Sequence, residues 1–198
     1  MSVLSFRYYL IILFLPLGWL VVFLCQEYVE SGSGLGANPD EALVRYLGEW
    51  SIRIFLIAYA ITPISRVFHW ARLARLRRAA GLTAFTYVCL HFASYLFLFV
   101  ELDWGLFKED LSERAYIIFG MLALGCLSLM AFTSTRAWKK RLGVNWRVLH
   151  LIVHPAIVFA FLHYIWLTRD GFGVIVFYVS IFGVLFGERI YRVTTSGR

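Results

Sequence analysis

Six long apolar stretches decide what this chain can fold into. The hydrocarbon core of a bilayer is about 30 Å thick, so a spanning helix needs roughly 20 mainly apolar residues. Hydrocarbon offers no partners to free backbone groups, so each such stretch must be helical. We therefore predict an all-α integral membrane protein, a bundle of six transmembrane helices that forms a single domain over residues 1–198. The predicted spans cover residues 8–26, 48–67, 81–101, 115–134, 149–168 and 172–191.

The composition excludes an ordinary water-soluble domain. Hydrophobic residues make up 61% of the chain and charged residues only 16%, whereas soluble domains average about half and about a quarter. The net charge of +7 does not indicate nucleic-acid binding, because the basic residues cluster between the apolar stretches. We interpret the first stretch as a retained span rather than a signal peptide, since only Arg7 precedes it and no small-residue cleavage site follows.

The charges between the spans predict the orientation of the chain, because loops rich in Lys and Arg stay in the cytoplasm. One side of the membrane receives 14 of the 19 basic residues: Arg7, Arg66, Arg72, Arg75, Arg77, Arg78, Arg136, Lys139, Lys140, Arg141, Arg147, Arg189, Arg192 and Arg198. The other side receives 11 of the 12 acidic residues: Glu27, Glu30, Asp40, Glu41, Glu49, Glu101, Asp103, Glu109, Asp110, Glu113 and Asp170. Every loop predicts the same orientation, with both termini in the cytoplasm.

Three prolines and one polar loop punctuate this pattern. Pro16, Pro63 and Pro155 are expected to kink or end their helices, and Pro63 lies where the second span is predicted to end. The loop 31–40, SGSGLGANPD, should be irregular because it is rich in Gly, Ser, Asn and Pro. It is either a contact for an external partner or a plain connector. We find no internal repeat in the sequence.

Four of the five histidines lie within predicted spans. His91 is at the centre of the third span, and His150, His154 and His163 are on the fifth. Ionisable groups at membrane depth are costly and usually mark a functional site. A hydrogen bond to a neighbouring helix would explain a single such histidine equally well, but four on two helices indicate ligands.

The surroundings of these histidines narrow the choice of ligand. A zinc site usually adds Cys or carboxylate ligands, and the chain has no HExxH motif. A proton or ion relay usually includes intramembrane carboxylates, and no Asp or Glu lies at the middle of a predicted span. Imidazoles from facing helices suit the axial positions of haem iron. Cys25, Cys89 and Cys126 form no CxxCH haem-attachment motif, so the haem would be non-covalent and b-type.

Depth in the membrane predicts which histidines pair, because the third and fifth spans both start at a basic cluster and run outward. His91 lies 13 residues beyond Arg78, and His163 lies 16 beyond Arg147. These spacings correspond to roughly 20 and 24 Å from the cytoplasmic edge. We therefore predict that His91 and His163 clamp one haem in the outer half. His150, three residues past Arg147, would ligate a second haem or contact whatever delivers electrons.

The other candidates are assigned lesser roles. His154 precedes Pro155 and is interpreted as a structural residue or as a support for a ligand. His69 lies in the basic loop and is expected to be solvated. Arg77 and Arg78, at the mouth of the third span, either contact haem propionates or a flavin phosphate or simply anchor the chain at the cytoplasmic surface.

Four segments together resemble a known family. They are GLGANPDEALVRYLGEWSIR at 34–53, ITP at 61–63, RRAAGLTAFTYVCLHFASYL at 77–96 and AFTSTRAWKKRLGVNWRVLHLIVHPAIVFAFLHYIW at 131–166. They span most of the chain and are similar to the haem-binding membrane subunits of the bacterial periplasmic methionine-sulfoxide reductase system, the MsrQ (YedZ) family. That family belongs to the ferric-reductase-like transmembrane group, which also includes the NADPH oxidases.

The resemblance implies an electron-transfer subunit of the bacterial inner membrane, with no substrate-reducing site of its own. It implies that His91, His150 and His163 are haem-linked, and that electrons come from the quinone pool or from a cytoplasmic flavin reductase. The expected partner is a periplasmic, molybdopterin-containing methionine-sulfoxide reductase, which forms a heterodimer with the chain and repairs oxidised envelope proteins. FMN binding is implied by the resemblance alone, because the sequence has no flavin fingerprint.

One departure from the wider group bears on the number of haems. Ferric reductases and NADPH oxidases usually carry two histidines on each of two helices, and a cytoplasmic FAD/NADPH domain. Here the third span has one histidine, and about seven residues follow the sixth span. The choice between one haem and two stays open, and the donor is expected to be a separate molecule. Two alternatives remain: an autonomous membrane ferric or quinol reductase, and a metal transporter with a histidine relay.

Overall fold

Helices form all the regular secondary structure in the described part of the chain. The computed structural model describes residues 3–167 and 172–195. In chain order the α-helices are α1 (Val3–Val29), α2 (Pro39–Val67), α3 (Arg77–Leu98), α4 (Trp104–Glu113), α5 (Ala115–Phe132), α6 (Arg136–Leu142), α7 (Asn145–Leu149), α8 (Val153–Leu167) and α9 (Phe172–Thr195), with 3₁₀ turns η1 (Leu73–Arg75) and η2 (His150–Ile152). Residue 168 of the fifth predicted span, Asp170 and Arg198 lie outside the described residues.

The prediction of an all-α fold with six spans is confirmed. Within residues 3–167 and 172–195, six segments are long and apolar enough to cross a membrane: Phe6–Val29, Pro39–Val67, Leu73–Leu98, Ala115–Phe132, Asn145–Leu167 and Gly173–Arg192. The second begins earlier than the predicted residue 48, because strong start signals precede the apolar stretch. Asn38 caps the helix by accepting the Glu41 N–H, and Pro39 occupies its first turn.

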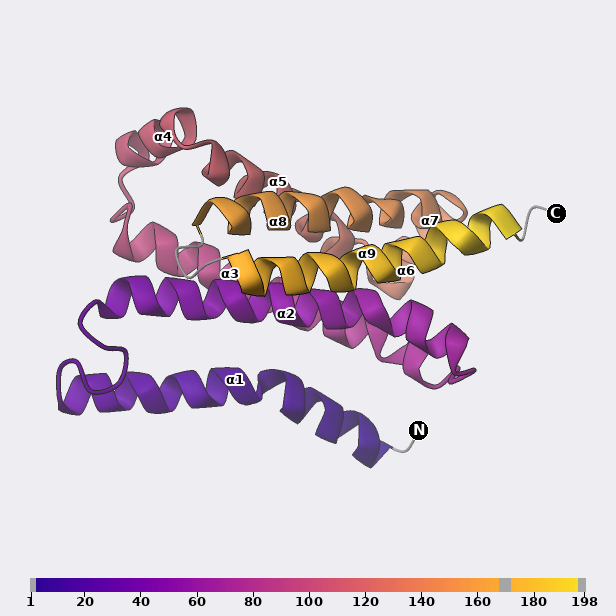
Figure 1. Cartoon of the computed structure of the whole chain (residues 1–198), viewed down its shortest axis with the longest axis horizontal. Helices are drawn as coiled ribbons and strands as arrows, with labels where there is room; N and C mark the ends of the chain where they lie inside the picture. Colours follow the sequence, from indigo (N-terminus) through magenta and orange to yellow (C-terminus); the bar gives the residue numbers. More distant parts are fainter. Residues whose placement is uncertain (1–2, 168–171, 196–198) are drawn as a thin grey trace.

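The charged segments lie at two opposite ends of the bundle. Segments 66–78 and 136–147, which hold the Lys and Arg clusters, lie at one end with the start of α1 and the end of α9 (Figure 1). We call this the basic end. The loop 30–38 and α4 lie at the opposite end, which we call the acidic end. The two charge clusters predicted from the loops are therefore separated by the length of the helices.

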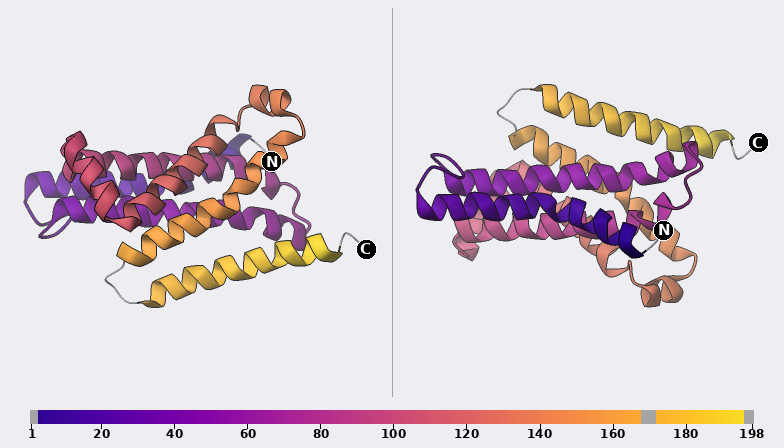
Figure 2. Two further views of the ribbon diagram at one scale, coloured as in Figure 1. Left: turned by 90° about the horizontal axis from the view of Figure 1, so that it is seen from above. Right: turned by 90° about the horizontal axis from the view of Figure 1, so that it is seen from below.

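Helix α2 is at the centre of the bundle, against α1, α3 and α9, while α5 packs chiefly against α8 and α3. The most deeply buried large side chains are Tyr59, Tyr87, Ile54 and Ile157. Helix α9 runs along the margin of the bundle, beside α8 and α2 (Figure 2). The structure is therefore built on two close helix pairs, α2 with α3 and α5 with α8.

The prolines are accommodated inside helices. Pro16 lies within α1, where the Tyr46 hydroxyl donates to the Pro16 carbonyl at 2.8 Å and the Tyr87 hydroxyl donates to the Leu13 carbonyl at 3.1 Å. Such bonds satisfy carbonyls near a proline that interrupts the helical ladder. Pro63 does not end α2, which continues to Val67. Pro155 is the third residue of α8, in the first turn, where a proline removes no hydrogen bond within the helix.

The loop between α1 and α2 is held against the end of α1 by one carboxylate. Glu27 accepts backbone N–H groups from Gly32 at 2.7 Å, Gly34 at 3.3 Å and Leu35 at 2.9 Å. A methyl group built on Gly34 would lie only 2.1 Å from the Phe23 carbonyl oxygen. The loop therefore packs directly on helix backbone, which only glycine allows at this position.

We expect Gly34→Ala to destabilise the protein by about 1–3 kcal/mol, because the new methyl must push the loop off α1. Gly18→Ala is the matched control, since its methyl would meet nothing within 4 Å and Ala favours helix. The melting temperature of each variant in detergent measures the difference. Equal melting temperatures for Gly34→Ala and the wild type would contradict the packing described for this loop.

Candidate functional site

The structure brings His91 of α3 and His163 of α8 together inside the bundle, as the depth argument predicts. The centroids of the two imidazole rings are 6.1 Å apart, and the ring planes are nearly perpendicular at 80°. The two residues are 72 positions apart in the sequence. Their approach therefore depends on the packing of the two helix pairs against each other.

Each imidazole is held by a backbone carbonyl of the neighbouring helix. His91 Nδ1 lies 2.9 Å from the Val44 carbonyl oxygen on α2, and His163 Nδ1 lies 2.7 Å from the Tyr116 carbonyl oxygen on α5. Because a carbonyl only accepts, Nδ1 carries the proton in both rings. Nε2 is then the unprotonated nitrogen, which is the form that binds a metal.

A glycine makes room for each ring. A methyl group on Gly48 would lie 3.0 Å from His91 Cε1, and one on Gly120 would lie 2.9 Å from His163 Nδ1. Each glycine lies one turn beyond the carbonyl that holds its histidine, since Gly48 follows Val44 and Gly120 follows Tyr116 by four residues. The imidazoles therefore lie directly on the backbone of α2 and α5.

The two histidines are held in the same way at the same sequence spacing. Both hydrogen bonds join residues 47 positions apart. We call the arrangement of a carbonyl, a glycine one turn later and a histidine on the next long helix a clasp. One clasp belongs to the α2–α3 pair and the other to the α5–α8 pair. The sequence shows no repeat, because only three positions in each pair must match.

The separation of the two rings is that of two imidazoles that would hold one iron ion between them. Two metal–imidazole bonds of about 2.0–2.1 Å, with the short distance from each nitrogen to its ring centre, require ring centres roughly 6 Å apart. The observed separation is 6.1 Å. Among the described residues, no group of three or more His, Cys, Asp or Glu side chains converges to bind a metal ion. A haem would supply the remaining ligands of an iron ion held by these two imidazoles.

His150 lies toward the basic end, at the start of η2. Its Nδ1 is 3.0 Å from the Trp146 carbonyl oxygen, and its ring stacks on the Trp146 indole with centroids 3.9 Å apart. Trp146 is itself fixed by donating from its indole N–H to the Thr133 carbonyl at 2.9 Å. His150 Nε2 is buried without a hydrogen-bond partner among the described residues. His150 is therefore a second partly buried imidazole, separate from the facing pair.

No second histidine faces His150 at the equivalent place on α3. His150 precedes His163 by 13 residues, and the residue that precedes His91 by 13 is Arg78. Arg77 donates to Thr62 Oγ1 on α2 at 3.2 Å. Arg78 instead lines a groove toward α1 with Phe6, Leu10 and Phe14. The two adjacent arginines therefore extend toward different helices.

His154 is engaged in the packing of α2, α8 and α9. Its Nδ1 is 2.9 Å from the Tyr59 hydroxyl, and its ring meets the Phe186 ring edge-on. Arg189 of α9 donates to the Tyr59 carbonyl at 2.9 Å and lies over the Tyr59 ring. This arrangement supports a structural role for His154. His69 is exposed in the basic loop, as expected.

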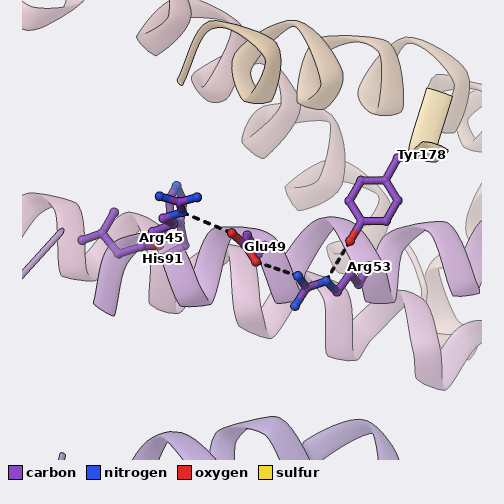
Figure 3. A network of polar contacts seen from close by, with 6 residues as sticks. Arg45, Glu49, Arg53, His91 and Tyr178 are labelled. Atoms are coloured by element: carbon purple, nitrogen blue, oxygen red, sulfur yellow. Dashed lines mark hydrogen bonds and ion pairs between the residues drawn. The ribbon is translucent and has the colours of Figure 1, made fainter. Parts of the chain in front are cut away.

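Sequence reasoning missed a ladder of charges on α2 beside His91. Arg45 and Arg53 both bond Glu49, at 3.2 and 2.6 Å, and Arg53 donates to the Tyr178 hydroxyl of α9 at 2.8 Å (Figure 3). The charge pattern predicts Glu49 outside the membrane, but it lies ten residues inside α2. The spacing of four residues between successive charges was the available signal. The ladder fixes α9 to α2 at the level of the site.

A second polar network connects the two histidine-bearing pairs at the acidic end. Tyr95, one turn beyond His91, donates to Asp110 of α4 at 2.6 Å. Arg114 lies 3.2 Å from the other Asp110 oxygen and donates to the Tyr116 hydroxyl at 3.4 Å. Tyr116 is the residue whose carbonyl holds His163. Asp110 therefore joins α3, α4 and the start of α5 around the site.

Comparison with known proteins places this arrangement in context. Residues 47–161 match the family described as "Ferric reductase like transmembrane component". The chain is 42% identical over 171 residues to a protein of Rhodospirillum rubrum, covering 84% of this chain and 82% of the relative. It is 36% identical over 180 residues to a protein of Caulobacter vibrioides, covering 90% and 83%. Both relatives are named "Protein-methionine-sulfoxide reductase heme-binding subunit MsrQ".

We expect the His91 and His163 rings to carry their protons on Nδ1. Gly48→Ala should change the position of the ring proton in His91 alone. The new methyl displaces the His91 ring from the Val44 carbonyl, so the two tautomers of that ring become mixed. ¹⁵N NMR of protein labelled at histidine measures the proton position in each ring. Gly120→Ala is the reciprocal variant and should alter His163 only. Unchanged ring signals in both variants would contradict the clasp geometry.

Proposed function

Because this chain belongs to the MsrQ family, within the ferric-reductase-like transmembrane proteins, we propose that it is a haem-containing electron-transfer subunit of the membrane. The observation that carries the proposal is the facing pair His91 and His163, 6.1 Å apart, with each Nδ1 bound to a carbonyl. The haem is b-type, since the chain has no CxxCH motif. Family membership supports a conduit that hands electrons to a separate reductase rather than reducing a substrate itself.

In this proposal His91 and His163 would hold the haem through Nε2, and the haem would supply reversible one-electron chemistry. The carbonyls of Val44 and Tyr116 accept the Nδ1 protons, and so they fix the ring planes and the tautomer. Hydrogen-bond acceptors beside metal-binding imidazoles usually have this role. Because Gly48 has no side chain, the His91 ring lies directly against α2. The Nε2 atom of His91 therefore stays in place when the charge of the site changes. The apolar spans exclude water from the site.

Electrons enter from the basic end, which the charge distribution assigns to the cytoplasm. The donor is the quinone pool or a cytoplasmic flavin reductase. His150, with its partnerless buried Nε2, binds a second haem or contacts the donor. Arg77 and Arg78 remain candidates for haem propionates or a flavin phosphate, and FMN rests on the resemblance to the family. With both termini at this end, the chain is oriented with its N- and C-termini in the cytoplasm.

Electrons leave at the acidic end, on the periplasmic side of the bacterial inner membrane. The receiving partner is a molybdopterin-containing methionine-sulfoxide reductase, which repairs oxidised envelope proteins and forms a heterodimer with this chain. The name that the relatives carry supports a reductase partner. The alternative is an autonomous ferric or quinol reductase. Co-purification with a molybdoenzyme and the inability of the isolated chain to reduce ferric chelates would argue against that alternative.

We expect His91→Ala and His163→Ala each to abolish most haem binding, because each removes one of two axial ligands. His150→Ala should leave a substantial fraction of the haem. Soret absorbance of the purified protein, with haem quantified per chain, measures the result.

His154→Ala is the matched control for the loss of an imidazole from the same region of α8, and it should retain the wild-type haem content. A colourless wild-type protein would refute the proposal and favour a histidine-relay metal transporter. Equal and complete loss of haem from the variants of His91, His150 and His163 would contradict the pairing.

A further inference from the structure

We propose that α4 is the surface on which the soluble redox partner docks and through which electrons leave the membrane subunit. The occupant is a water-soluble protein with a basic face around its redox centre. This inference rests on the proposed function, since it identifies the contact surface for the reductase that receives the electrons. Three observations carry it: the way α4 is fixed over the histidine pair, a line of aromatic rings, and the charge of the segment.

A tight turn folds α4 back over the end of α3. Val100 is buried, with only 1% of its surface exposed. Glu101 and Leu102 follow with positive φ values of 51° and 59°, which non-glycine residues rarely adopt. The Leu102 N–H donates to the Leu96 carbonyl at 3.0 Å. Asp103 then caps α4 by accepting the Gly105 N–H at 2.6 Å. The position of α4 is therefore determined by the end of the helix that carries His91.

The Asp110 network fixes the other end of α4 to both histidine-bearing helix pairs. Asp110 accepts the Tyr95 hydroxyl at 2.6 Å and is paired with Arg114. Tyr95 lies one turn from His91. Arg114 bonds the hydroxyl of Tyr116, and the carbonyl of Tyr116 holds His163. A protein bound to α4 would therefore be seated next to the histidine pair rather than at a distant loop.

A line of aromatic rings runs from α3 to the surface of α4. Phe92, the residue after His91, meets Phe107 of α4 edge-on with centroids 6.4 Å apart. Phe107 in turn meets Trp104 with centroids 5.9 Å apart. Trp104 is 69% exposed although it is a large apolar side chain. Exposed aromatic residues beside polar ones are typical of protein interfaces.

The charge of the segment favours a basic partner. Between residues 101 and 114, five acidic side chains accompany two basic ones, so the segment carries a formal charge of −3 in a chain of net charge +7. Glu109 and Glu113 are exposed. Opposite charges at the rim of an interface steer encounter and raise the association rate. In each transfer the membrane subunit is oxidised by one electron and the redox centre of the partner is reduced by one.

The test compares single variants of the protein in nanodiscs after reduction with dithionite. Stopped-flow absorbance follows reoxidation by the purified methionine-sulfoxide reductase, and ferricyanide serves as a small oxidant that needs no docking surface. We expect Glu109→Lys to lower the second-order rate constant about fivefold at low ionic strength, with the difference disappearing as salt is added. We expect Trp104→Ala to lower the rate at every salt concentration and Trp104→Phe to restore it. Because ferricyanide is itself an anion, it is compared at high ionic strength, where it should oxidise all variants equally.

The matched control is Glu30→Lys, which makes the same charge change at the acidic end but at the end of α1, away from α4 (Figure 1). It should react within twofold of the wild type. Wild-type rates for both Glu109→Lys and Trp104→Ala would overturn the inference and leave α4 as a helix resting on the lipid surface. If the wild type reacts with ferricyanide but not with the reductase, the proposed function fails as well.

Discussion

The hydrogen bond from an imidazole Nδ1 to a backbone carbonyl is the interaction on which the rest of this site depends. It fixes the tautomer, the ring plane and the unprotonated nitrogen of both His91 and His163 at once. Such a bond costs little inside a membrane, because a carbonyl within a helix keeps a second lone pair free. It also requires the ring to lie against the helix backbone, which explains the glycines at positions 48 and 120. The packing of α2 with α3 and of α5 with α8 follows from these close approaches.

Much of the architecture was predictable, because a bilayer allows few solutions. Length and apolar composition predicted six spans, and residues 3–167 and 172–195 contain six helical segments of that kind. The pairing of His91 with His163 was predictable for a related reason: in helices that start at the same surface, residue number measures depth. The start of α2 was not predicted, because Asn38 and Pro39 extend the helix beyond the apolar residues. The segments that lie next to a helical turn in space decide whether hydrocarbon or water surrounds it. A hydropathy pattern does not show which segments these are.

The parts of the site that could not be predicted are those that depend on contacts between distant helices. Neither carbonyl acceptor has a side-chain signal, since any residue could supply it. Glu49 was counted with the charges of the outer side, yet it forms an ion pair with Arg53 beside the site, and Arg53 reaches Tyr178, 125 residues away. Arg77 and Arg78 are adjacent in sequence but extend to α2 and toward α1 because successive helical residues point about 100° apart. Such features depend on the relative rotation of helices.

The two clasps also determine the order in which the site is completed. The α2–α3 clasp uses residues 44 to 91 and closes as soon as those two helices meet in the membrane, because both its parts lie within one helical hairpin. The second clasp closes only after α8 has been synthesised, since it joins residues 116 and 163. During synthesis, a bound cofactor would therefore join two preassembled halves late and act as a brace between them. Its loss would loosen the contact between the hairpins while leaving each hairpin intact.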